Sequence, residues 1–335
     1  MMSSARRRAV IGAVAGALAL LPASQSHSQG GARAPAETWW VAKSKGGVYK
    51  PPNKPLWKQA DLLKAHAGQN NWSEQIVRDP EQDATYNSAA SGTKFATRMH
   101  ADTPTLFVVV AGQLHFDVEG QEPVTATRGA LVNIMHTTLY SYEVTGDKNA
   151  LWVEVNPPNY QAVYPTSAPQ PAAPKGAGIV KVSFNHTPGA YTGNNKLMVN
   201  TFDDVIGKCQ PRGAVVVDDH LWASPLIGYL NPADNKCGTG SGNIGDGGRG
   251  GAAAFNPASI FGHFHPGPAE WWIIQSGAIS GKFENTGEFH AVEGDVLYAA
   301  PMMWHQMGSE APSGPSIRLA LGGYNFINMN NTAGQ

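Results

Sequence analysis

The stretch GHFHPGPAE, residues 262–270, decides the fold because it places two histidines before, and a carboxylate after, a Pro-Gly-Pro run that interrupts the strand. His263 and His265 are two residues apart, so on an extended strand both imidazole rings project from the same face. The Pro-Gly-Pro run ends that strand, and Glu270 opens the apolar run WWII, which predicts the next strand. We expect a turn at 293–295 and a strand at 296–300 to return the chain to His305.

These residues form a candidate metal site. Three imidazoles and one carboxylate are a ligand set that borderline divalent metals prefer when some coordination positions stay open. A single histidine on a strand is more often a core or surface residue. The pattern is larger here, because Gly277 follows Glu270 by seven residues and the block Gly294…Pro301…His305 comes after it. The sequence therefore predicts a metal site rather than isolated histidines.

The same residues resemble the first motif of the cupin superfamily, G-x5-H-x-H-x3–4-E-x6-G. The match runs from His263 to Gly277, with Pro257 where the leading glycine is usual. The run HFHPGPAE is especially similar to germin-type cupins. The first motif is therefore present in nearly complete form.

The second cupin motif, G-x5-P-x-G-x2-H-x3-N, is matched less closely. Gly294 and His305 keep the family spacing, but the proline comes one residue late, at Pro301. Met302 stands where glycine is usual, and Ser309 stands where asparagine is usual. These departures concern the turn more than the ligand.

The resemblance implies an all-β fold of two cupin-type double-stranded β-helix (jelly-roll) barrels with one divalent transition metal per chain. The implied ligands are His263, His265, Glu270 and His305. Manganese, iron and copper suit this set best, and nickel and zinc are also compatible with it. The resemblance to some cupin dioxygenases also implies a catalytic role for Glu270, which could leave the metal and accept a substrate proton. The alternative is that Glu270 is a ligand only.

Length and composition fit a two-domain globular protein. The chain has 335 residues, of which 42% are hydrophobic and 15% charged, enough to fill two cores. The 38 glycines and 24 prolines suit many short strands joined by turns. The net charge of −1 gives no argument for a nucleic-acid partner. We expect a small-molecule substrate, and a homo-oligomer is left open.

The N-terminus predicts a signal peptide over residues 1–28. Three arginines (6–8) precede a thirteen-residue apolar run (9–21), which is too short for a membrane span of about 20 residues. We therefore expect an exported protein, periplasmic or secreted, that leaves the membrane after cleavage. The paired arginines also fit a twin-arginine signal, so the export route stays open.

The chain has two cysteines, Cys209 and Cys237. In an exported protein the expected reading is one disulfide, worth roughly 3 kcal/mol in the chain-entropy model. Two free thiols are the alternative.

Turn signals and short apolar runs divide the chain into two β domains joined by a linker. We expect an N-terminal barrel over 36–164, a Pro/Ala linker over 165–177 and the metal-binding barrel over 178–328. A glycine-rich loop at 238–251 is either a mobile loop or a substrate lid. The elements expected from local pattern are an entry strand at 38–42, a helix at 56–67, six strands in the first half (94–99, 105–111, 113–118, 130–135, 139–144 and 151–155), and a strand at 178–182 that opens the second half.

The two halves can be aligned with each other. In this register Arg98 replaces His263, His100 matches His265, Thr105 replaces Glu270 and Tyr140 replaces His305. One ligand of four survives, which predicts a first barrel that has lost its metal. A weak second site formed by His100 and His136 is the alternative.

The surroundings of the candidate site are apolar and aromatic. If Glu270 points into the barrel, alternation along its strand turns Trp272 and Ile274 inward and Trp271 outward. We expect a substrate pocket lined by Trp272, Ile274 and Met303.

Three functions remain open for such a protein. The first is a metal-dependent oxidoreductase that resembles the bicupin dioxygenases and acts on a small organic substrate, a phenol or a carboxylate. The second is a non-catalytic bicupin that binds a small ligand or stores metal. The third is a metal-dependent lyase or isomerase.

Overall fold

The computed structural model describes residues 42–101, 103–158, 160–169, 171–173, 175–183, 185–186, 198–200, 255–258, 262–309, 317–322 and 329–330. The predicted signal peptide, the glycine-rich loop, Cys209 and Cys237 lie outside these residues. The chain from Lys43 onward forms one compact unit. None of the helices in the described ranges is long and apolar enough to cross a membrane.

The described chain is almost entirely β, with one short helix. The elements of the first half are β1 (Leu56–Trp57), α1 (Gln59–Ala65), β2 (Trp72–Arg78), β3 (Asp83–Ala89), β4 (Lys94–His100), β5 (Thr105–Ala111), β6 (Gln113–Val118), β7 (Val124–Thr127), β8 (Leu131–Ile134), β9 (Tyr140–Thr145), β10 (Ala150–Asn156) and β11 (Ala162–Val163). The later ones are β12 (Met198–Asn200), β13 (His263–Phe264), β14 (Glu270–Ser276), β15 (Ala278–Phe283), β16 (Gly287–Val292), β17 (Val296–Ala299), β18 (His305–Ser309), β19 (Ile317–Gly322) and β20 (Met329–Asn330).

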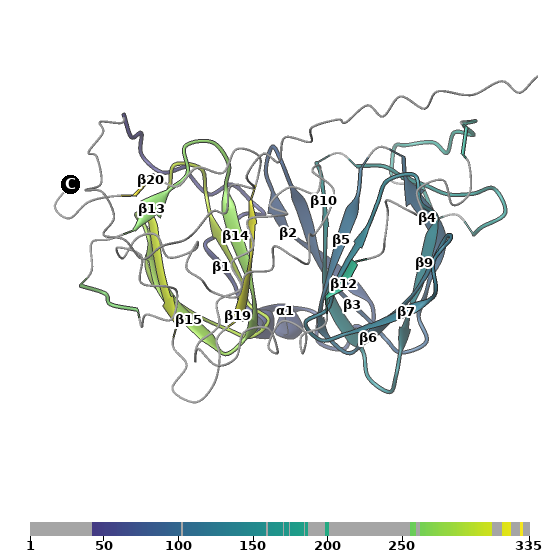
Figure 1. Ribbon diagram of the computed structural model, residues 1–335, viewed down its shortest axis with the longest axis horizontal. Coiled ribbons are helices and arrows are strands. Elements are labelled where there is room, and N and C mark those ends of the chain that lie inside the picture. Colours follow the sequence, from purple (N-terminus) through teal and green to yellow (C-terminus); the bar gives the residue numbers. More distant parts are fainter. Residues whose placement is uncertain are drawn as a thin grey trace, which may run out of the picture. The chain divides into compact units, whose positions relative to one another are not determined.

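Two antiparallel sheets form the first barrel (Figure 1). One has the order β12-β8-β5-β10-β3-β2 and the other β11-β4-β9-β6-β7. Strand β12 follows the linker in sequence yet pairs with β8, Met198 facing Asn133. A strand that follows the linker therefore still belongs to the first barrel.

The second barrel also consists of two antiparallel sheets (Figure 1), with the orders β1-β17-β14-β19 and β16-β15-β18-β13-β20. Its edge strand β1 precedes the first barrel in sequence and pairs Leu56 with Leu297. Each barrel thus receives an edge strand from a distant part of the chain. The prediction of an all-β fold with two barrels is confirmed.

Strand β5 shows why the sequence folds in this way. It reads TLFVVVA, and all but its last residue are buried. Phe107 and Val109 pack inside the first barrel, whereas Leu106 and Val108 belong to a cluster shared with the second barrel. Because side chains alternate along a strand, one apolar run can serve two cores.

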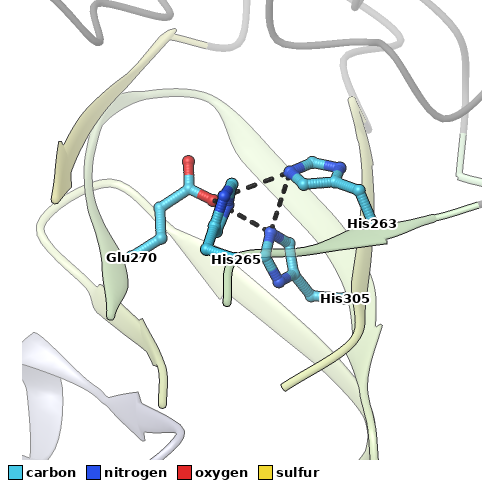
Figure 2. Close-up of side chains that lie close together, drawn as sticks. All are labelled: His263, His265, Glu270 and His305. Carbon is cyan, nitrogen blue, oxygen red and sulfur yellow. Dashed lines mark hydrogen bonds and ion pairs between the residues drawn. The ribbon is translucent and has the colours of Figure 1, made fainter. Parts of the chain in front are cut away.

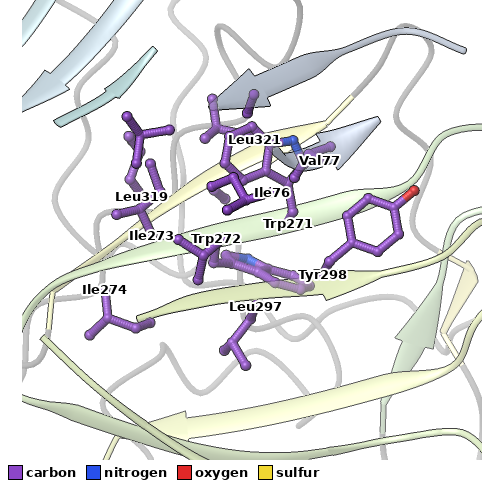
Figure 3. Packing of buried hydrophobic residues seen from close by; sticks show 14 of the residues in the cluster. Ile76, Val77, Trp271, Trp272, Ile273, Ile274, Leu297, Tyr298, Leu319 and Leu321 are labelled. Atoms are coloured by element: carbon purple, nitrogen blue, oxygen red, sulfur yellow. The ribbon is translucent and has the colours of Figure 1, made fainter. Parts of the chain in front are cut away.

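The shared cluster is the larger of the two cores (Figure 3). It combines Ile76 and Val77 from β2 with the aromatic and aliphatic residues of β14 and the neighbouring strands. Trp271 and Trp272 are 0% and 1% exposed. At about 1.5–3 kcal/mol for each fully buried Val, Leu, Ile or Phe side chain, the cluster is a principal source of stability.

Most of the predicted strands of the first half are confirmed, because their apolar alternation is local. The predicted helix at 56–67 is wrong at its start, since Leu56 and Trp57 form β1 and α1 begins at Gln59. The cause is tertiary: Asp295 accepts the Gln59 N–H at 2.9 Å and so caps the helix from the second barrel. Of the predicted strand at 38–42 only Ala42 is described, and it has no regular structure.

The predicted strand at 178–182 is also wrong. The segment has no regular structure, and Ile179, Val180 and Val182 are 61–77% exposed. A β-prone sequence needs a partner edge, which local pattern does not supply. Conversely, β2 and β3 were not predicted, because their sequences WSEQIVR and DATYNSA are largely polar. They are strands because β10 pairs with β3 along its whole length.

Asp79 occupies the turn between β2 and β3. Its Oδ1 accepts the backbone N–H groups of Glu81 at 2.7 Å and Gln82 at 2.8 Å. Burial raises the pKa of Asp79 to about 6, although these hydrogen bonds oppose the shift. The folded pKa therefore exceeds the unfolded value of about 3.9. The folded chain binds more protons between these values, so this group lowers stability as the pH rises from about 4 to about 6.

Asp79→Asn is expected to raise the free energy of unfolding at pH 7 relative to the wild type. The amide keeps an acceptor oxygen for both N–H groups but carries no charge to bury. The gain should shrink on acidification and vanish near pH 4, where the wild-type carboxyl is protonated. Urea unfolding of both proteins from pH 4 to pH 7 measures it, and a difference that stays constant over this range would contradict the assignment.

Candidate metal centre

Four side chains from three strands and one loop converge in the second barrel (Figure 2). His263 on β13 pairs directly with His305 on β18, and His265 follows β13 by one residue. Glu270 begins β14. The Nε2 atoms of His265 and His305 lie 2.7 and 2.9 Å from Glu270 Oε2, and that of His263 lies 3.7 Å from it. The structure therefore brings all four predicted ligands together.

The distances fit a metal ion among these atoms. One donor atom from each residue lies within 4.8 Å of every other. Bonds of about 2.0–2.2 Å from a metal to nitrogen or oxygen place adjacent ligands about 3 Å apart. The observed separations of 2.7–3.7 Å from the carboxylate oxygen agree with such an arrangement. It is the one group of this kind in the ranges that the structure describes.

His305 supports the same conclusion through its tautomer. Its Nδ1 lies 3.0 Å from the backbone oxygen of Met303, which can only accept, so Nδ1 carries a proton. In the neutral ring the lone pair of Nε2 then faces Glu270 Oε2 at 2.9 Å. Two acceptors at this distance need a cation between them, either a proton or a metal ion. A backbone hydrogen bond on the other ring nitrogen is also how metal-binding histidines are oriented.

The protonation states suit ligation as well. Burial lowers the pKa of His263 to about 3, and the nearby His305 adds to this effect. Burial alone would raise the pKa of Glu270, but the charge of His265 and hydrogen bonds from the imidazoles outweigh it and hold this pKa well below its usual value. At neutral pH His263 is therefore neutral and Glu270 ionised, and a metal ion would take the place of the imidazole protons that face the carboxylate.

The residues predicted to line a pocket are all buried. The Trp272 ring lies 5.2 Å from that of His305, on the same face of β14 as Glu270, whereas Trp271 donates to Gln82 of the first barrel. Trp271 and Trp272 thus lie on opposite faces of β14, as the predicted alternation requires of these two residues. Ile274 and Met303 are 0% and 2% exposed, within the shared cluster. Their role in a substrate pocket stays a prediction.

The corresponding place in the first barrel holds an ion pair. Arg98 pairs with Tyr140 across two strands, as His263 does with His305. The Arg98 guanidinium donates to both oxygens of Glu154 at 3.0 and 3.1 Å and to the Tyr140 hydroxyl at 2.9 Å. His100 stacks on Tyr160, with ring centroids 5.2 Å apart. The proposed alignment of the two halves is thus supported. In the first barrel the Arg98 guanidinium occupies the place where the second barrel has its histidines.

Sequence reasoning did not identify Glu154 as the partner of Arg98. The available signal was a single acidic residue in the apolar strand sequence ALWVEVN, which indicates a buried charge in need of a partner. Other residues missed are Lys43, Tyr49 and Glu284, which contact the loops that carry the histidines. Their distance in sequence from these loops left no local signal.

Met302, at the position where the second cupin motif has glycine, adopts a left-handed conformation with φ of 63°. Its N–H donates to the His265 backbone oxygen at 2.8 Å, which explains why the turn is retained. This conformation costs a non-glycine residue roughly 1–2 kcal/mol. The turn therefore has the backbone conformation that favours glycine, although methionine occupies the position.

Met302→Gly is expected to raise the free energy of unfolding by about 0.5–1 kcal/mol, after the entropy that glycine gains in the unfolded chain is subtracted. Denaturant unfolding of the metal-free protein measures the change. Asn285→Gly is the matched control, since asparagine tolerates its own φ of 66° better and should gain less. A loss of stability in Met302→Gly larger than in Asn285→Gly would contradict the argument.

No protein-family model and no curated protein sequence matches this chain. Solved structures do match it. The salicylate 1,2-dioxygenase of Pseudoaminobacter salicylatoxidans, in adducts with gentisate, superposes with a TM-score of 0.51 at 10% identity, over 84% of this chain and 85% of that chain. The oxalate decarboxylase of Lactobacillus farciminis, in a formate complex, gives a TM-score of 0.46 at 14% identity, over 86% and 90%.

Identities this low show a shared fold and nothing finer, and the dioxygenase match carries that conclusion. It covers 84% of this chain and so agrees with the two-barrel architecture. The chain therefore has a cupin-type fold of two barrels.

Proposed function

We propose that this protein is a metal-dependent cupin enzyme with one divalent transition metal per chain, held by His263, His265, Glu270 and His305. The observation that carries the proposal is the convergence of three imidazole nitrogens on one oxygen of a buried carboxylate. A bound metal would supply Lewis-acid or redox chemistry at coordination positions that the four residues leave open. Manganese, iron and copper are the first metals to test.

Glu270 serves in this proposal chiefly as a ligand. Its pKa is held well below the usual range, which makes it a weak base, because the best general bases have a pKa near the working pH. Figure 2 shows its second carboxylate oxygen turned away from the imidazoles, so that oxygen is the one that could accept a substrate proton. The buried Trp272 ring lies 5.2 Å from the His305 ring and forms an apolar wall beside the centre.

The reaction that we propose is oxidation of a small organic substrate, a phenol or an aromatic carboxylate. The support is that one solved structure with a similar fold is a salicylate 1,2-dioxygenase in adducts with gentisate. Aromatic and apolar walls such as Trp272 suit a ring better than a small dianion.

Metal analysis followed by oxygen uptake tests the proposal. Purified protein should contain close to one metal per chain, and the metal-loaded protein should consume oxygen with at least one member of a panel of hydroxybenzoates, gentisate included. His265→Ala should abolish both metal content and oxygen uptake. Substrate turnover without oxygen uptake would support the lyase or isomerase alternative, and ligand binding that survives in His265→Ala without turnover would support a non-catalytic binding protein.

We further propose that the protein is exported to the periplasm or secreted, on the strength of residues 1–28 alone. Fractionation of cells that express the full chain tests this. Retention in the cytoplasm of a variant with Arg7→Lys and Arg8→Lys, but not of the wild type, would assign the twin-arginine route.

A further inference from the structure

The segment Lys43–Tyr49, which precedes the first barrel in sequence, packs against the loop that carries His305. Gly47 donates its N–H to the Pro301 backbone oxygen at 2.9 Å. A Cβ on Gly46 would lie 3.0 Å from the Met303 Cα, so the two backbones are in close contact. The segment therefore touches the metal-centre loop more than 250 residues further along the chain.

Tyr49 fixes the same loop by its side chain. Its hydroxyl lies 3.0 Å from both the Met303 sulfur and the Tyr298 backbone oxygen. Met303 in turn provides the backbone oxygen that orients His305. Only Trp304 thus separates Met303, which Tyr49 contacts, from His305 in the sequence.

Lys43 contacts β13 directly and is linked to the loop before His305 through Glu284. Its ammonium lies 5.3 Å from the centre of the Phe264 ring, and Phe264 stands between His263 and His265. The ammonium also donates to Glu284 Oε2 at 2.6 Å.

Glu284 completes the connection to His305. The same Oε2 accepts the Trp304 N–H at 3.0 Å, and the Glu284 N–H donates to the Trp304 oxygen at 2.8 Å. Trp304 immediately precedes His305. A continuous set of contacts therefore runs from Phe264 through Lys43 and Glu284 to Trp304.

We infer that Lys43 and Glu284 are positioning residues, which hold the His263–His265 strand and the His305 loop at the separation that the metal requires. The inference rests on the proposed metal site. Outer partners of metal ligands commonly affect affinity by about 10–100-fold, because they fix ligand orientation. Glu284 also neutralises the lysine, so the ammonium does not repel the metal.

The competing explanation is an ordinary surface ion pair. The Lys43 and Glu284 side chains are 22% and 27% exposed, and pairs of this kind contribute little to stability. The two explanations differ in what they predict for the metal. An ordinary pair would leave metal affinity unchanged, whereas a positioning pair would affect affinity more than stability.

The experiment compares Lys43→Met, Lys43→Arg and Glu284→Gln with the wild type in the full chain. The dissociation constant for Zn²⁺ is measured by competition with a chelator, and the visible absorption of the Co²⁺-loaded protein reports ligand geometry. Lys43→Met and Glu284→Gln should each weaken Zn²⁺ binding about 10-fold and alter the Co²⁺ spectrum, and Lys43→Arg should keep the affinity and the spectrum of the wild type. Lys94→Met, which removes the Lys94–Glu143 pair of the first barrel, is the matched control and should change neither.

Zn²⁺ affinity and a Co²⁺ spectrum in Lys43→Met equal to those of Lys94→Met would overturn the inference and leave the proposed function intact. Tighter binding in Lys43→Met would overturn it too, since the ammonium would then act by repulsion. A wild-type protein that binds neither ion would overturn the proposed function and the inference together.

Discussion

Glu270→Gln is expected to lower the affinity for a divalent transition metal roughly 100-fold. Metal binding at four-ligand zinc sites is worth about 10–16 kcal/mol in total, so one ligand in four accounts for about 3 kcal/mol. Glutamine has nearly the shape of glutamate, but its amide carries no negative charge to hold the metal. Chelator competition measures the affinity, and oxygen uptake should fall with metal content.

The matched control is Glu288→Gln on β16 of the same barrel, where the carboxylate is exposed. It makes the same chemical change away from the imidazoles, so its metal affinity should equal that of the wild type. Equal affinities in Glu270→Gln and Glu288→Gln would contradict the assignment of Glu270 as a ligand. Thermal unfolding of the metal-free proteins checks that Glu270→Gln still folds.

The sequence predicted the parts of this molecule that depend on local spacing. His263 and His265 share a face because they are two residues apart, and the strand β14 is evident from its apolar run. The alignment of Arg98 with His263 required only that both halves repeat one pattern, and strand pairing now supports it. Such features need no knowledge of distant contacts.

Features that depend on distant contacts were missed or placed wrongly. Helix α1 starts at Gln59 because Asp295, far along the chain, caps it. The polar strand β3 is held by β10, whereas the β-prone segment at 178–182 has no regular structure. Lys43 and Glu284 meet across 241 residues. No local pattern encodes these pairings, since each joins residues that are far apart in the sequence.

Arg98→Met is expected to destabilise the protein by about 3–5 kcal/mol, the usual cost of leaving one partner of a buried ion pair unpaired. Arg98 and Glu154 side chains are 15% and 9% exposed. The neighbouring Glu154 charge holds the pKa of Arg98 well above its ordinary value against the opposing effect of burial. Without the arginine, the buried Glu154 carboxylate would lose the cation that pairs with it. Denaturant unfolding measures the loss, which is large against a typical total of about 5–15 kcal/mol.

Two further variants decide whether the charge or the arginine side chain matters. Arg98→Met combined with Glu154→Leu removes both charges and should recover most of the stability, since apolar replacements of buried pairs are often neutral or stabilising. Arg78→Met breaks the more exposed Arg78–Asp83 pair, 3.8 Å long, and should cost less than about 1 kcal/mol. If Arg98→Met costs no more than Arg78→Met, the ion pair does not stabilise the first barrel. A large loss of stability in Arg98→Met that Glu154→Leu restores would mean that the two charges stabilise the first barrel as a pair. This pair stands at the place where the second barrel has histidines around a carboxylate.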